Sequence, residues 1–102
     1  MMEWKRGATF SAHCTYTPPE GGLETLEGAT ITSQIRASGS LVADLTASLA
    51  VDGLSFDLTA DETDDWPVGV AEWDVRIEIE GTVYYTTTVP LRILRQVTQV
   101  AA

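Results

Sequence analysis

The stretch VAEWDVRIEIE, from Val70 to Glu80, decides the fold because apolar and polar side chains alternate along its whole length. Such a period of two is typical of a β-strand that buries one face and exposes the other. Glu80 and Gly81 then predict a tight turn, after which TVYYTTTV returns as a second strand. We expect Ala71, Trp73, Val75, Ile77 and Ile79 to face inward, and Glu72, Asp74, Arg76, Glu78 and Glu80 to face outward.

Alternation of the same kind recurs in both directions from this strand. It is found in TFSAHCTYT (9–17), GATITSQIRAS (28–38), LVADL (41–45) and LSFDL (54–58), and Pro- or Gly-containing turn signals separate these segments. No segment shows a helical stripe of three or more turns. About six to eight short strands with turns between them predict an all-β sandwich or barrel.

The length and composition favour one globular domain. A chain of 102 residues with 44% hydrophobic and 21% charged residues is expected to fold as one unit over residues 1–102. We expect an ordered core over about residues 7–95, with tails at 1–6 and 96–102. The N-terminus lacks the apolar region of a secretory signal, and no apolar run is long enough to span a bilayer. The sequence therefore predicts a protein that is neither secreted nor membrane-spanning.

The net charge of −9 is concentrated in one part of the sequence. Between Ala37 and Val75 there are nine acidic residues and no Lys or Arg. A surface of this sign repels the phosphates of DNA and RNA, so we expect no nucleic-acid partner.

The residue types that usually carry catalysis or bind zinc are scarce. His13 is the single histidine and Cys14 the single cysteine, and neighbouring strand residues face opposite sides of a sheet. They therefore do not form a catalytic pair, and no G-x-S-x-G motif is present. We predict that the protein is not an enzyme and needs no cofactor.

The acidic stretch TADETDDWPVG, from Thr59 to Gly69, allows two interpretations. As a calcium loop, its candidate ligands are Asp61, Glu62, Asp64 and Asp65, although the glycine of an EF-hand loop is replaced by Trp66. As a structural connector, Asp61 or Thr59 caps at most a one-turn helix near residues 61–66, and Trp66 packs onto the core. The spacing favours the connector.

An interaction surface is the remaining class of site. Exposed aromatic side chains are enriched where proteins dock, and of the two adjacent tyrosines we expect Tyr84 to face outward. The candidate interaction residues are Asp57, Asp61, Glu62, Asp64, Asp65, Glu72, Asp74 and Tyr84.

The order of these features resembles a group of small immunoglobulin-like β-sandwich proteins of tailed bacteriophages and prophages. The resemblance covers roughly Gly7 to Thr98, from a G-x-[ST]-F opening to a [WY]-Asp-[LVI] strand. The matching positions are Gly7, Thr9, Phe10, Leu26, Gly28, Ala29, Arg36, Thr63, Pro67, Gly69, Trp73, Asp74 and Val75.

This resemblance implies an immunoglobulin-like antiparallel β-sandwich and a non-catalytic virion protein of the tail, baseplate or neck. Related domains form the N-terminal part of some upper baseplate proteins, and they assemble with copies of themselves or with neighbouring proteins. We therefore expect a homo-oligomer or contacts with other virion proteins, located in the virion or, during assembly, in the bacterial cytoplasm. The alternative is a small module that binds a carbohydrate or a calcium-dependent partner through the loop from Asp61 to Trp66.

Overall fold

The strands of the computed structural model, which describes residues 2–18, 20–22 and 24–98, confirm the all-β prediction. Eight strands are present and no helix occurs among these residues. No described segment offers a helix that could span a membrane. The strands are β1 (Met2–Lys5), β2 (Phe10–Thr15), β3 (Thr30–Ala37), β4 (Ser40–Leu49), β5 (Ser55–Ala60), β6 (Gly69–Ile79), β7 (Thr82–Tyr85) and β8 (Val89–Leu94).

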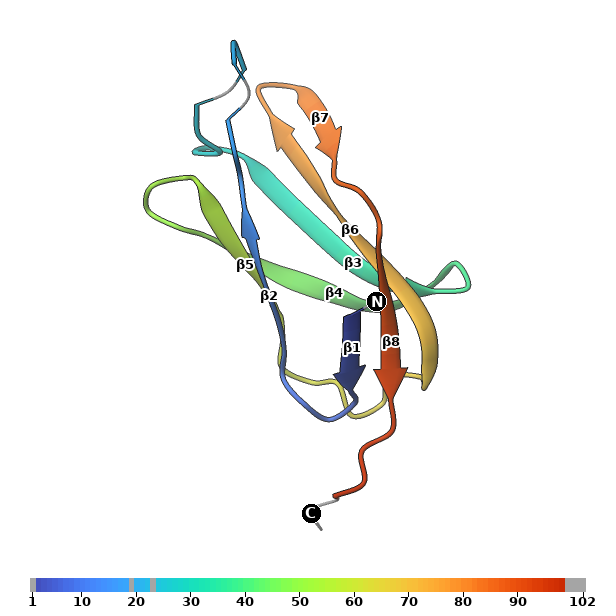
Figure 1. Cartoon of the computed structure of the whole chain (residues 1–102). Coiled ribbons are helices and arrows are strands. Elements are labelled where there is room, and N and C mark those ends of the chain that lie inside the picture. The colour runs from blue at the N-terminus through green and yellow to red at the C-terminus, as the bar shows by residue number, and fades with distance from the viewer. Residues whose placement is uncertain (1, 19, 23, 99–102) are drawn as a thin grey trace.

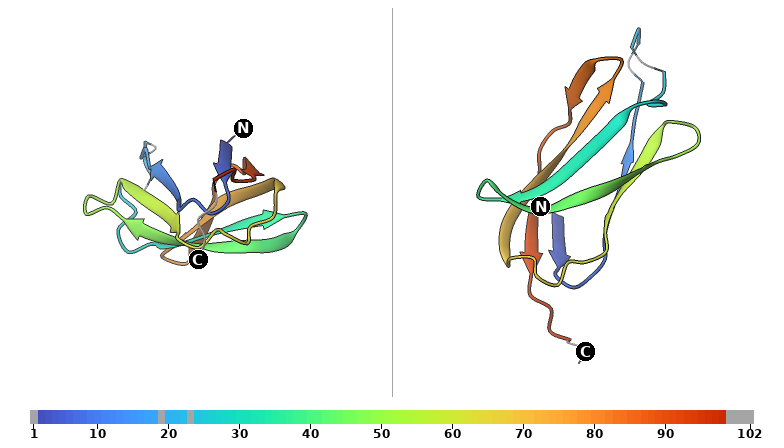
Figure 2. Two further views of the ribbon diagram at one scale, coloured as in Figure 1. Left: turned by 90° about the horizontal axis from the view of Figure 1, so that it is seen from below. Right: turned by 180° about the vertical axis from the view of Figure 1, so that it is seen from behind.

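The strands follow one hydrogen-bonded path in the order β1-β8-β6-β3-β4-β5-β2, and β7 pairs with β6 beside this path. All described pairings are antiparallel except that of β1 with β8. Seen from one end, the path curls into an incomplete ring whose two ends, β1 and β2, face each other (Figures 1 and 2). The architecture is a nearly closed mixed barrel.

The expected sandwich of two separate sheets therefore needs a correction. The cause is β4, which is ten residues long and belongs to both sides of the molecule. Its first half pairs with β3 and its second half, from Thr46 to Leu49, pairs with β5. The β3–β4 pairing also contains a register shift between Ile35 and Arg36. Because one strand joins both sides, the layers are continuous there.

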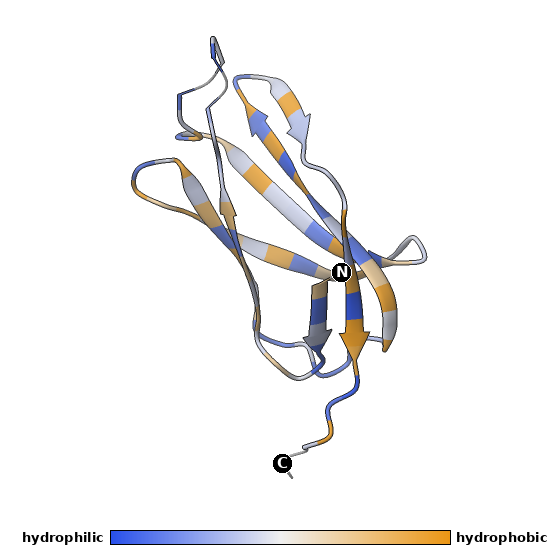
Figure 3. Ribbon diagram, in the orientation of Figure 1, coloured by the Kyte–Doolittle hydropathy of each residue, from blue (hydrophilic) through white to orange (hydrophobic). Residues whose placement is uncertain are grey.

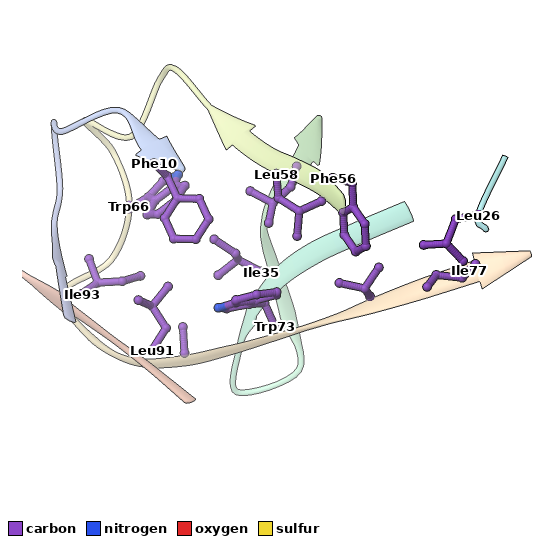
Figure 4. Packing of buried hydrophobic residues seen from close by; sticks show 13 residues of the cluster. Phe10, Leu26, Ile35, Phe56, Leu58, Trp66, Trp73, Ile77, Leu91 and Ile93 are labelled. Atoms are coloured by element: carbon purple, nitrogen blue, oxygen red, sulfur yellow. The ribbon is translucent and has the colours of Figure 1, made fainter. Parts of the chain in front are cut away.

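The core forms where the inward faces of these strands meet. Along β6 the alternation predicted from the sequence is confirmed, since all five inward residues are buried. Figure 3 shows the accompanying alternation of hydropathy along the strand. Phe10 is fully buried, and its ring contacts that of Trp4. It also contacts the rings of Trp66 and Trp73 (Figure 4). The predicted turn at Glu80-Gly81 is also present, with φ angles of 51° and 79° that suit a two-residue hairpin.

One boundary expectation was wrong. Residues 1–6 were expected as a tail, but Met2–Lys5 form β1, because their alternating side chains complete the edge beside β8. The limit of at most a one-turn helix near residues 61–66 holds, since the chain there forms a turn in which the Trp66 N–H donates to the Thr63 carbonyl. Met1 and residues 99–102 of the expected tails lie outside the described residues.

Candidate functional site: an open apolar groove

The four acidic residues of the β5–β6 loop are exposed and do not come together as a metal site. Asp61, Glu62, Asp64 and Asp65 all lie on the surface. Within the described ranges, no group of three or more His, Cys, Asp or Glu side chains is arranged to hold a metal ion. The weak calcium candidates of the sequence are therefore neighbours in the chain that do not converge in space.

Thr63, in the middle of these acids, organises the loop. Its buried side chain donates a hydrogen bond from Oγ1 to the Ala8 carbonyl at 2.7 Å. Its carbonyl accepts from the N–H groups of Gly7 and Trp66, each at 3.2 Å. Sequence reasoning assigned the cap to Asp61 or Thr59, because a Thr that reaches a distant backbone leaves no local pattern.

We expect Thr63→Val to lower the free energy of unfolding by about 0.5–1.5 kcal/mol, the net value of one hydrogen bond. The variant does not leave the Ala8 carbonyl without a hydrogen-bond donor, because that carbonyl also accepts from Trp4 Nε1 at 3.3 Å. The larger cost of an unsatisfied buried acceptor therefore does not apply. Urea unfolding measures the loss, with exposed Thr46→Val on β4 as the matched control. Equal stability of the two variants would show that the Thr63 bond does not hold the loop.

The rest of the acidic segment lies elsewhere on the molecule. Asp57 projects from β5, where its Oδ1 is 2.7 Å from His13 Nδ1. Glu72 and Asp74 are on the outer face of β6, and the register places Glu72 opposite Arg36 of β3. Arg76 contacts Glu78 on the same face at 3.3 Å. The candidate interaction residues thus occupy separate places, and arginines from outside the acidic segment interleave with it.

The orientation of the tyrosines is the reverse of the prediction. Tyr84 pairs with inward-facing Ile77, so it lies on the inner face of the sheet, whereas Tyr85 pairs with Arg76 on the outer face. Both remain exposed, at 48% for Tyr84 and 65% for Tyr85. The inner face at β7 is uncovered because β7 extends along β6 past the part that pairs with β8.

A groove of about 360 Å³ opens in the gap of the barrel, and sequence reasoning did not find it. One wall is the end of β2 and the other is the chain from Thr86 to Val89, which joins β7 to β8. Thr86 is tied to β6 by two bonds at 3.0 Å, one from its N–H and one to its hydroxyl. The lining residues are Cys14, Thr15, Tyr16, Leu26, Phe56, Trp73, Val75, Ile77, Thr86, Thr87 and Val89.

The thiol of Cys14 lies in this groove, where burial raises its pKa above the ordinary value and the negative charge of Asp57 raises it further. Only the thiolate is nucleophilic, so a raised pKa lowers the reactive fraction at any pH near 8. We expect iodoacetamide to alkylate the folded protein more slowly than the same protein unfolded in urea. Asp57→Asn removes the negative charge that raises the Cys14 pKa, so we expect iodoacetamide to alkylate the folded variant faster than the folded wild type. Equal alkylation rates for folded and unfolded protein would contradict the conclusion that the fold raises the Cys14 pKa and shields the thiol.

A second hollow lies at the opposite end of the barrel gap from β7. Its volume is about 850 Å³, and its walls are the β1–β2 turn, Asp64 and the chain after β8. Arg6 Nε donates to Gln96 Oε1 at 2.9 Å across it, so the chain segments flanking β1 and β8 are linked there. It is lined by Lys5 and Arg6 as well as Asp64, and therefore has no single charge.

Comparisons with known proteins do not assign the chain to a family. No protein-family model matches it, and no curated protein matches it.

Proposed function

We propose that this protein is a non-catalytic structural or adaptor component of a phage or prophage virion, in the tail, baseplate or neck. It would act through contacts with other virion proteins or with copies of itself, in the virion and, before that, in the host cytoplasm during assembly. The observation that carries the proposal is the open side of the barrel, where an edge of β2 that no described strand pairs with borders an apolar groove. Unpaired edges are natural sites for pairing with another chain.

The strand neighbours support an immunoglobulin-like origin for the fold. In that fold the second, fifth and fourth strands are neighbours in one sheet, and the third, sixth and seventh are neighbours in the other. Here β2, β5 and β4 are consecutive on one side, and β3, β6 and β8 are consecutive on the other. The additional pairing of β4 with β3 is the departure, and it joins the two sheets. This agreement supports the immunoglobulin-like architecture that the sequence resemblance implies.

The position of the nucleophilic and basic side chains supports a non-catalytic role. His13 points outward and contacts Asp57, and both side chains are more than half exposed. Cys14 points inward into the groove and is half-buried. The sheet therefore separates the single histidine from the single cysteine.

Mass spectrometry of virions purified from the phage or induced prophage that encodes the protein tests the proposal. We expect the protein at a fixed copy number per particle, and we expect a deletion mutant to yield defective particles that a plasmid copy restores. Its presence in the lysate but absence from purified particles would overturn the virion assignment.

A further inference from the structure

The groove lies in line with β1 along β8. β1 runs parallel to β8, with Met2 opposite Leu91 and Lys5 opposite Leu94. The groove begins next to Val89, just beyond Leu91, on the line that β1 would follow if it were longer. The groove thus has the place of one further extended strand.

The backbone of β2 faces the same gap. β2 pairs with β5 along one edge, and the Tyr16 N–H also donates to that side, to the Leu54 carbonyl at 2.8 Å. Because successive residues of an antiparallel strand direct their backbone groups to opposite sides, the N–H and C=O of His13 and Thr15 point toward the gap. No described strand pairs with this edge. It offers hydrogen-bonding groups at the spacing that a strand requires.

The charge of the protein around the groove indicates which kind of partner strand would bind there. Residues 7–29 and 40–65, which hold β2, β4, β5 and the chain segments beside them, contain ten acidic residues and no Lys or Arg. A second copy would bring another net charge of −9 to this side, and like charges oppose association. A partner segment with positive charge is attracted.

We propose that the open side takes up an extended, positively charged segment of another protein, which pairs with β2 and places alternate apolar side chains in the groove. This inference rests on the proposed function, since it names the surface and the kind of partner that such an adaptor uses. In this mode main-chain hydrogen bonds supply affinity, and the apolar groove selects the side chains.

The direct test uses the synthetic peptide KTVTVTVK and a control peptide, KTSTSTSK, in which serine replaces each valine. Cys14 lines the groove, so its alkylation by iodoacetamide reports occupancy. At a peptide concentration about ten times its Kd, we expect the rate to fall about tenfold, because mainly free protein reacts. The serine peptide is expected to leave the rate unchanged. Equal effects of the two peptides, or no effect of either, would overturn the proposal.

Variants locate the binding to the groove. Exposed Thr87 lines the groove, and we expect Thr87→Trp to block the valine peptide, whereas Thr82→Trp on β7 does not. Thr15→Pro removes an N–H that points to the gap and should abolish binding, since proline is tolerated on an edge strand but donates no bond. Unchanged melting temperatures show that the variants fold. Binding that survives both Thr87→Trp and Thr15→Pro would place the peptide elsewhere.

The outcomes for this inference and for the proposed function are separate. Protection of Cys14 that depends on protein concentration without peptide, together with dimers in light scattering, would assign the groove to a second copy and overturn the inference. The virion assignment would stand in that case, because particle composition tests it. Absence from virions would overturn that assignment without changing the peptide result.

Discussion

Replacing Phe10 with alanine is expected to lower the free energy of unfolding by about 3–5 kcal/mol, as for other large buried aromatic side chains. Phe10 has no exposed surface. Its ring centroid lies 5.0 Å from that of Trp4, 5.7 Å from that of Trp66 and 6.5 Å from that of Trp73. These partners come from β1, the β5–β6 loop and β6, so the cavity would loosen three separate segments at once.

Urea unfolding followed by tryptophan fluorescence measures this loss. Tyr85→Ala is the control, because Tyr85 is 65% exposed on the outer face and its removal is expected to cost at most about 0.5 kcal/mol. A loss below about 1 kcal/mol for Phe10→Ala would contradict the central place of this residue in the core.

Gly53→Ala is expected to lower the free energy of unfolding nearly as much as Phe10→Ala, for a different reason. Gly53 has a φ of +70°, and an added Cβ would lie 2.9 Å from the Cβ of Thr25. Its carbonyl also accepts the Leu26 N–H at 2.8 Å, so the turn after β4 is attached to the segment that precedes β3. We expect a left-handed strain of about 1–2 kcal/mol together with an overpacking cost of about 1–3 kcal/mol.

Gly39→Ala separates these two costs. Gly39 has a similar φ of +81°, but nothing lies within 4 Å of its added Cβ. It should therefore lose only the strain energy of about 1–2 kcal/mol. Equal losses of unfolding free energy in the two variants would show that Thr25 yields without cost and that the close approach at Gly53 is unimportant.

Most of the strand pattern could be predicted from the sequence, because it is local. The alternation from Val70 to Glu80 identified the residues that β6 buries, and the same period placed His13 and Cys14 on opposite faces of β2. The Glu80-Gly81 turn was predicted from its glycine. Each of these features depends on residues within one strand or one hairpin.

Features that depend on distant pairing could not be predicted. Four residues are too few for β1 to be recognised as a strand, and its parallel partner β8 is almost ninety residues further along the chain. The double pairing of β4, which turns the expected sandwich into a nearly closed barrel, depends on a change of partner between Leu45 and Thr46. A strand that pairs within one sheet and a strand that pairs with both sides have the same length and the same alternation, so the sequence pattern does not distinguish them.

The candidate site was the least predictable part for the same reason. The acidic run suggested one docking surface, but the register places Arg36 opposite Glu72 and the loop carboxylates point elsewhere. The groove draws its lining from β2, β6 and the chain before β8, so no single stretch of sequence marks it.

Amide hydrogen exchange tests the central claim most directly, by comparing the free protein with the protein in the assembly recovered from virions. Edge amides without a partner exchange fast in the free state. We expect the N–H groups of His13 and Thr15, which point into the gap, to exchange much more slowly in the assembly. Those of Cys14 and Tyr16, which already face β5, should change little. Unchanged exchange at His13 and Thr15, with slowing confined to another surface, would contradict the claim that the protein is held through its open side.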